Sequence, residues 1–197
     1  MRPSNGKLDM FVVASRFTEN TWQENCAYRE KREARGRPLG CVYGSPLPMA
    51  NSIPYKAPVF VLEMNFAQHK IMGIGLVKND CLVDGHRIYS DTQYNVCSYD
   101  GKYRVDREEM TRKEEDLMER LDEMLFWQSK IWRTRNGLTQ IPKWVRETED
   151  LNYEAIIKNM FVSRYRDGEK KSPAPGEKIV IRVKKKLRPK LRPCARA

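Results

Sequence analysis

The residues with the clearest chemical character lie near the C-terminal end of the chain. Residues 186–193 are a tetrapeptide written twice, Lys-Leu-Arg-Pro followed by Lys-Leu-Arg-Pro. A proline at every fourth position excludes a regular helix and favours an extended, polyproline-like backbone. An extended cationic segment can follow a phosphate backbone, and such contacts carry no base-sequence information. The cations expected to bind a polyanion or an acidic protein are Lys184, Lys185, Lys186, Arg188, Lys190 and Arg192. An inert solubility tail is the alternative.

A second set of residues mixes tryptophans with basic side chains between positions 126 and 146. Aromatic faces with interleaved cations suit single-stranded nucleic acid, which needs stacking platforms and phosphate partners. Trp132, Arg133 and Arg135 are the residues expected to make these contacts. Alternatively, the tryptophans pack a helix onto a sheet and their basic neighbours face solvent. The full set is Trp127, Lys130, Trp132, Arg133, Arg135, Lys143, Trp144 and Arg146.

Residue patterns of catalysis and metal binding are weak in this chain. No two cysteines have Cys-x-x-Cys spacing, so a zinc site is not expected. Cys81 followed by His86 is too sparse a pattern for a nucleophile and its base. Gly73-Ile74-Gly75 lacks the third glycine and the following helix of a dinucleotide-binding loop. Such glycines more often mark a bulge or a close crossing in a small barrel. We therefore expect no enzyme activity, no metal and no cofactor.

Charge divides the chain into a body and a basic tail. Residues 1–163 contain 24 Lys and Arg and 23 Asp and Glu, a net charge of +1. Residues 164–197 contain 13 Lys and Arg and 3 Asp and Glu, a net charge of +10. The sequence thus predicts one α+β domain over 1–163 and an extended basic tail over 164–197.

Membrane and secretion signals are not evident. No apolar run approaches the roughly 18 residues of a membrane span. The first seven residues lack the apolar region of a signal peptide. The five cysteines are odd in number and widely spaced, which favours reduced thiols in a cytosolic or nuclear compartment.

Hydrophobic patterning predicts a small curved antiparallel sheet or a barrel, packed with two to three helices. Strands are expected at 8–14, 59–64, 70–78, 86–90, 94–99 and 102–105, and 179–183 is a candidate strand. The polar residues 65–69 should make a hairpin of the strands that flank them. Residues 38–58 carry five prolines and predict an irregular wrapped loop.

Helices are expected at 19–34, from residue 111 onward, and at 151–161. The first places Trp22, Cys26 and Arg29 on one face. The second begins with a capping box, Thr111 to Glu114, in which side chains satisfy unpaired backbone amides. Its apolar stripe, which should pack on the sheet, consists of Leu117, Leu121, Met124 and Leu125.

The segment 59–77, read as Val-Phe-Val-Leu-Glu-Met-Asn and then Lys-Ile-Met-Gly-Ile-Gly-Leu-Val, resembles the core hairpin of PUA-like barrels, the PUA, ASCH and EVE group. The resemblance covers about 20 residues. It implies a barrel that binds RNA or modified bases in a pocket, but it carries over no pocket residue.

A longer set of segments is similar to a family of small uncharacterised proteins of large eukaryotic DNA viruses. These segments are 21–25, 28–29, the hairpin, 88–95 and 101–107, in order within residues 8–145. The resemblance implies a viral origin and no known enzyme activity, and the tail lies outside it.

Together these features favour a non-catalytic structural component of a large viral assembly, of the minor capsid or core type. Its basic arm would bind other proteins of the assembly, with DNA or RNA as a second partner. The expected location is the virion or the host cytoplasm or nucleus, and the protein is not expected to be secreted. The alternative is a PUA-like protein that binds RNA or DNA without sequence preference.

Overall fold

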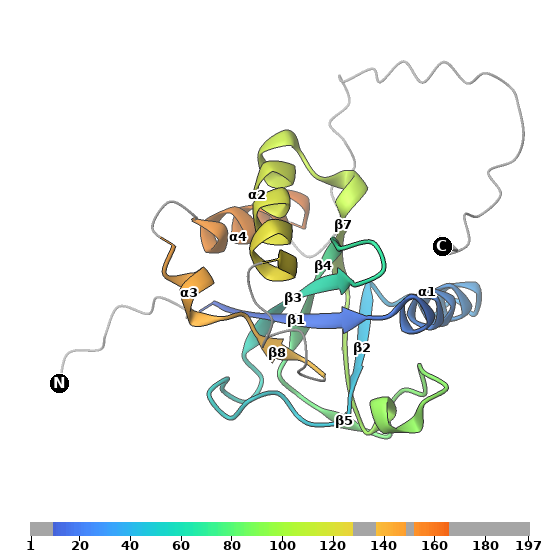
Figure 1. Cartoon of the computed structure of the whole chain (residues 1–197). Helices are drawn as coiled ribbons and strands as arrows, with labels where there is room; N and C mark the ends of the chain where they lie inside the picture. Colours follow the sequence, from blue (N-terminus) through green and yellow to red (C-terminus); the bar gives the residue numbers. More distant parts are fainter. Residues whose placement is uncertain (1–9, 128–136, 149–151, 166–197) are drawn as a thin grey trace, which may run out of the picture.

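A computed structural model describes residues 10–127, 137–148 and 152–165 (Figure 1). These residues form two sheets and four α-helices, so the expected α+β class is confirmed for them. One sheet has the order β7-β4-β3-β1-β8, and the other has the order β2-β6-β5. The strands are β1 Phe11–Phe17, β2 Cys41–Ser45, β3 Pro58–Asn65, β4 Lys70–Lys78, β5 Leu82–Val83, β6 Cys97–Gly101, β7 Tyr103–Asp106 and β8 Thr139–Gln140. The helices are α1 Glu19–Ala34, α2 Arg112–Asp122, α3 Lys143–Arg146 and α4 Tyr153–Arg164.

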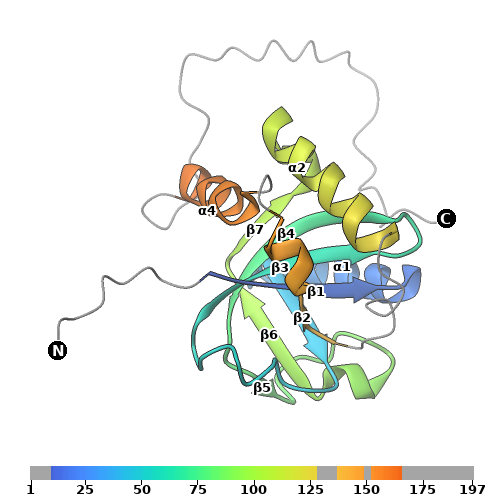
Figure 2. The same ribbon diagram turned by 60° about the vertical axis from the view of Figure 1, so that its left-hand side comes forward.

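The five-stranded sheet is the middle layer, because side chains from both of its faces are buried. On β3, Phe60 and Leu62 point into a core shared with α2 and α4. Val59 and Val61 point into a second core, which β2, β6 and α1 complete. Figures 1 and 2 show α2 and α4 together on one side of this sheet and the second sheet on the other. The alternation follows from the strand period of two residues.

The expectation of a purely antiparallel sheet is wrong, because β1 and β3 run parallel, from Phe11 beside Val59 to Phe17 beside Asn65. Parallel neighbours need a long crossover, and α1 with β2 supplies it. The described strands form two separate sheets and no closed barrel.

Several expected elements are confirmed at their bounds. The helix over 19–34 is α1, the strand over 70–78 is β4, and residues 66–69 join β3 to β4 as a hairpin. The capping box of α2 is present, with the backbone N–H of Thr111 donating to Glu114 at 2.7 Å. Beyond α2 the chain continues as a π-helix, Glu123–Trp127. The apolar stripe packs on the sheet as expected, with Leu117, Leu121 and Leu125 buried in its core.

Two expected elements are wrong, for different reasons. Residues 38–58 are not one irregular loop, because the short segment between Pro38 and Pro46 forms β2 and pairs with β6. Residues 86–90 form no strand, because the side chain of Asn95 takes the place of a strand partner. Its Oδ1 accepts from the N–H groups of Ile88 and Tyr89, and its Nδ2 donates to the Tyr89 carbonyl. The candidate strand at 179–183 lies outside the described residues.

One cysteine expectation is also wrong. Cys81 and Cys97 are joined as a disulfide that closes a separation of 16 residues, so not all five thiols are reduced. Cys41 is a free thiol and is buried.

Among the helices of the described residues, none combines the length and the apolar character that crossing a bilayer requires.

The glycines of β4 lie where two layers approach most closely. A methyl group at Gly75 would collide with the Tyr43 hydroxyl and would lie 2.7 Å from the Cys41 sulfur. A methyl group at Gly73 would lie 2.9 Å from the Arg104 guanidinium and 3.0 Å from the Glu63 carboxylate. The interpretation of Gly73-Ile74-Gly75 as a close crossing is thus confirmed.

We predict that Gly75→Ala lowers the free energy of unfolding by about 1–3 kcal/mol, because the added methyl overpacks the core. Urea unfolding followed by circular dichroism would measure this loss. The Tyr43→Phe background serves as the control, since it removes the atom nearest to the new methyl. The double variant should lose less stability than the sum of the single variants, and simple additivity would contradict the crossing.

Candidate functional site

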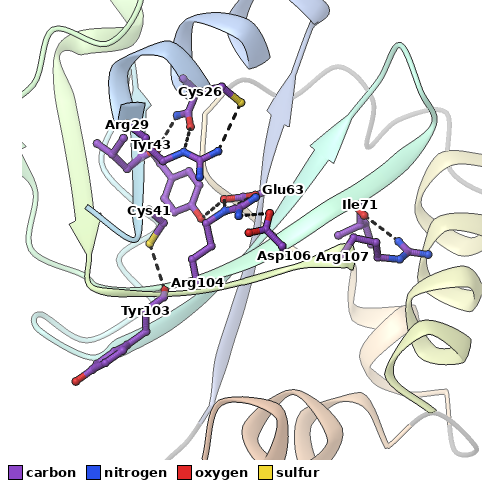
Figure 3. A network of polar contacts seen from close by, with 12 residues as sticks. Cys26, Arg29, Cys41, Tyr43, Glu63, Ile71, Tyr103, Arg104, Asp106 and Arg107 are labelled. Carbon is purple, nitrogen blue, oxygen red and sulfur yellow. Dashed lines mark hydrogen bonds and ion pairs between the residues drawn. The ribbon is translucent and has the colours of Figure 1, made fainter. Parts of the chain in front are cut away.

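A buried ion pair lies between the two sheets. The side chains of Glu63 and Arg104 are 1% and 6% exposed. Arg104 Nη2 donates to Glu63 Oε2 at 2.7 Å, and its Nε lies 3.0 Å from both carboxylate oxygens. Figure 3 shows the guanidinium and the carboxylate facing each other, with Tyr43 beside them. A guanidinium that meets both oxygens of a carboxylate makes the strongest kind of side-chain hydrogen-bonded pair.

Backbone irregularity and missing side chains make room for this pair. The register between β3 and β4 shifts between Leu62 and Met64, and Glu63 lies at this irregularity. The extra residue is on β4, where Met72 and Gly73 lie opposite Glu63, and Glu63 keeps the face of Val59 and Val61. Arg104 lies opposite Gly75 in the β4–β7 register, and Gly73 leaves space beside its guanidinium.

Neighbouring side chains satisfy the remaining polar atoms of the pair. The Tyr43 hydroxyl donates to Glu63 Oε1 at 2.7 Å. The second terminal nitrogen of Arg104 donates to Asp106, which is half exposed. Arg29 extends from α1 toward this group in Figure 3, and its Nε donates to Asn25 Oδ1 at 3.2 Å. No ion pair joins Arg29 to a carboxylate within the described residues.

The protonation states follow from this arrangement. Burial alone would raise the pKa of Glu63, but the charge and hydrogen bonds of Arg104 outweigh it, and the pKa is lowered. Burial would lower the pKa of Arg104, and the Glu63 carboxylate raises it well above its ordinary value. Burial raises the pKa of Cys41 to about 12 and that of Tyr43 well above its ordinary value. At neutral pH the pair is therefore charged, and the thiol and phenol keep their protons.

A cleft of about 1010 Å³ opens over this network. Its apolar lining includes Trp22, Cys26, Leu39 and Met72. Its charged lining residues are Arg29, Glu30, Glu33, Lys102, Arg104, Asp106 and Glu108. The cleft therefore offers an apolar wall together with carboxylates and cations, a lining typical of a ligand-binding site.

A second charged network connects the sheet to the helices on its other face. Arg107 donates to Glu115, to Asp122 at 3.0 Å and to the Ile71 carbonyl at 2.8 Å. Burial raises the pKa of Asp122, although Arg107 opposes this effect. These contacts fix α2 on the sheet and leave no group of this network directed into the cleft.

The nine residues expected to bind a partner all lie outside the described residues. They are Trp132, Arg133, Arg135, Lys184, Lys185, Lys186, Arg188, Lys190 and Arg192.

Two neighbours of the predicted tryptophan cluster are described. Trp127 is 64% exposed and stacks on His69, with ring centroids 5.1 Å apart and planes 18° apart. Trp144 is 39% exposed. Trp127 thus contacts the hairpin that joins β3 to β4 while most of its side chain stays exposed.

The two histidines have separate roles in the described structure. His86 is buried between the Tyr28 hydroxyl and the Asp100 carboxylate, each 2.9 Å from one ring nitrogen. Cys81 is bonded to Cys97, so Cys81 and His86 do not form a nucleophile and base. The residues that the structure describes contain no cluster of three His, Cys, Asp or Glu side chains suited to a metal ion.

Sequence reasoning missed the site residues Tyr43, Glu63 and Arg104. A signal was present, because Glu63 is the one charge inside the apolar run from Val59 to Met64. An acidic residue in a buried strand requires a cationic partner. The partner itself could not be chosen without the pairing of β4 with β7.

We predict that Glu63→Gln lowers the free energy of unfolding by about 3–5 kcal/mol, because it leaves Arg104 charged and buried without its partner. The lowered pKa of Glu63 contributes stability above its ordinary value of 4.5, and this contribution is lost as the pH falls through the lowered value. Urea unfolding between pH 7 and pH 3 should therefore show the difference from wild type shrinking below about pH 4.5. Glu119→Gln, at an exposed position on α2, is the matched control. A constant difference across this range would contradict the assignment.

Comparison of the chain with protein-family models, with curated proteins and with solved structures found no match.

Proposed function

We propose that the protein is a non-catalytic structural component of a large viral assembly, of the minor capsid or core type. In this proposal a folded body carries a basic C-terminal arm, residues 164–197, that binds neighbouring proteins. DNA or RNA is the second candidate partner of the arm.

The contrast in charge is the observation that carries the proposal. Residues 1–163 have a net charge of +1, whereas the 34 residues that follow have a net charge of +10. A field of one sign confined to one end of a chain attracts and orients an oppositely charged partner. The Lys-Leu-Arg-Pro repeat adds leucines and fixed φ angles, which phosphate binding does not require and a protein groove does.

The base of the arm is firmly attached to the body, which supports a mechanical role. Arg164, the last residue of α4, donates to both oxygens of Glu114 at 2.8 Å. The Tyr165 hydroxyl donates to the Arg104 carbonyl at 2.5 Å and accepts from the Arg104 N–H at 3.4 Å. A pull on the arm would therefore be transmitted to α2 and β7.

The buried network also favours binding over catalysis. Glu63 and Arg104 neutralise each other, and Cys41 and Tyr43 keep their protons at neutral pH. The similarity of residues 8–145 to small proteins of large DNA viruses, inferred from the sequence, supports the viral setting.

We predict that the protein is present in purified particles of the virus that encodes it, and that neutralising the arm reduces its incorporation. The variant replaces Lys184, Lys185, Lys186, Arg188, Lys190 and Arg192 by Gln, and quantitative mass spectrometry of the particles measures the result. The matched control replaces six exposed cations of the body by Gln, namely Arg35, Arg37, Lys56, Lys78, Lys113 and Lys158. Absence of the wild-type protein from the particles, or equal loss in both variants, would overturn the proposal.

A second candidate function is sequence-tolerant binding of single-stranded nucleic acid by a PUA-like module. The exposed stack of Trp127 on His69 supports it, since the cations Lys130, Arg133 and Arg135 follow closely in the sequence. An exposed aromatic face can stack a base, and nearby cations can bind phosphates.

We predict for this candidate that Trp127→Ala weakens binding of a single-stranded oligonucleotide by about 1–3 kcal/mol, or about 5- to 150-fold. Fluorescence anisotropy at several salt concentrations measures the affinity. The dependence on salt should not change, because no charge is removed. Tyr55→Ala, at an aromatic side chain that is 70% exposed, is the control. Equal affinities of wild type and the Trp127 variant would exclude stacking.

A further inference from the structure

We infer that the cleft over the Glu63–Arg104 pair binds residues 186–193 of the protein's own arm when the protein is not assembled. The occupant is the repeated Lys-Leu-Arg-Pro segment of the same chain. This inference concerns the isolated protein, so it can fail while the proposed function stands.

The charges of the cleft suit a basic occupant. Four carboxylates line it, those of Glu30, Glu33, Asp106 and Glu108, and Glu63 lies directly beneath. Three cations oppose these five charges, so the cleft and its floor have a net charge of −2 within a chain of net charge +11. Arg104 is already paired with Glu63 and Asp106, which leaves Glu30, Glu33 and Glu108 as the available acidic groups. A phosphate backbone would be repelled by the same carboxylates.

The apolar part of the cleft suits the leucines of the repeat. Trp22, Leu39 and Met72 line its wall, beside Pro38. In an extended polyproline-like segment, Leu187 and Leu191 lie about 12 Å apart on a stiff backbone. A stiff segment loses little conformational entropy when it binds. Leucines that serve no purpose in phosphate binding would bury apolar surface here, while the lysines and arginines face the carboxylates.

The arm starts at the edge strand β7, on the face of the sheet opposite to the cleft. Tyr165 is held by the Arg104 backbone, and its ring lies 4.8 Å from that of Tyr103. Tyr103 belongs to β7, the strand that also supplies Arg104 and Asp106 to the cleft. Twenty residues separate Tyr165 from Lys186 and can span up to about 70 Å, so the repeat can reach the cleft without strain. This tether gives the repeat an effective concentration on the order of millimolar at the cleft of its own chain. Binding within one chain is therefore favoured over binding of the arm of a second copy.

Carbodiimide cross-linking of the full-length protein tests this inference, because it joins a lysine to a carboxylate only at direct contact. Cross-links are expected from Lys184, Lys185, Lys186 or Lys190 to Glu30, Glu33 or Glu108. Glu119 of α2 and Glu123 of the following π-helix, both exposed in the other layer, are the internal controls. Peptide mass spectrometry identifies the linked residues. Cross-links to these two control carboxylates as frequent as those to the cleft would overturn the inference.

A mixture of isotopically labelled and unlabelled protein distinguishes binding within one chain from binding of the arm of another copy. Cross-linked peptides should combine two heavy or two light halves. A substantial share of mixed pairs would show that the arm of another copy occupies the cleft, and would overturn binding within one chain.

Trypsin digestion gives an independent readout. The bonds after Lys186 and Lys190 should be cleaved several-fold faster in the Glu30→Gln, Glu33→Gln, Glu108→Gln variant than in wild type. The matched control, Glu119→Gln, Glu123→Gln, Glu154→Gln, should be cleaved at the wild-type rate. Circular dichroism establishes that both variants are folded. Equal cleavage rates in all three proteins would overturn the inference.

Discussion

The ion pair between Glu63 and Arg104 is the interaction on which the rest of the fold depends. Moving two charges out of water costs several kcal/mol for each ion, so such a pair is stable only where its geometry is nearly complete. Here the completion comes from three strands: β3 supplies Glu63, β7 supplies Arg104, and β2 supplies the Tyr43 hydroxyl. The register irregularity between β3 and β4 and the two glycines of β4 lie next to this group of side chains. The pair therefore fixes how the two sheets approach each other.

The polar groups of the Glu63–Arg104 network are hydrogen-bonded to one another, which limits what they can do. None of the buried polar groups around Glu63 is available to a substrate, since each has a partner within the protein or keeps its proton. The groups left to interact are those at the edge of the cleft, above all Arg29 and the glutamates of α1. In the proposed function, the body would present these groups to a partner, while the arm carries most of the net charge of the chain.

Local signals in the sequence predicted the elements well, and long-range pairing escaped them. The bounds of α1 and β4 follow from capping, helix-ending and alternation patterns that depend on neighbouring residues. The prolines of 38–58 concealed β2, because they flank the strand and do not interrupt it. The parallel pairing of β1 with β3, and the choice of Arg104 as the partner of Glu63, depend on contacts across 41 to 48 residues. Asn95 replaced a strand by side-chain hydrogen bonds, and no local pattern distinguishes this from a β-strand.

Taken together, the two proposals give one basic segment two competing partners, the cleft and an external surface. If the cleft binds the repeat, an external partner must bind it more tightly than the cleft does to release it, because a ligand shifts an equilibrium only by its differential affinity. A carboxylate cleft of net charge −2 is a weak competitor for a segment of this charge density. A dense polyanion or a strongly acidic protein surface would displace it, whereas scattered surface carboxylates in the host cell would not. A low affinity of the cleft for the arm would therefore be useful. It would hold the arm only until a partner with a higher density of negative charge binds it.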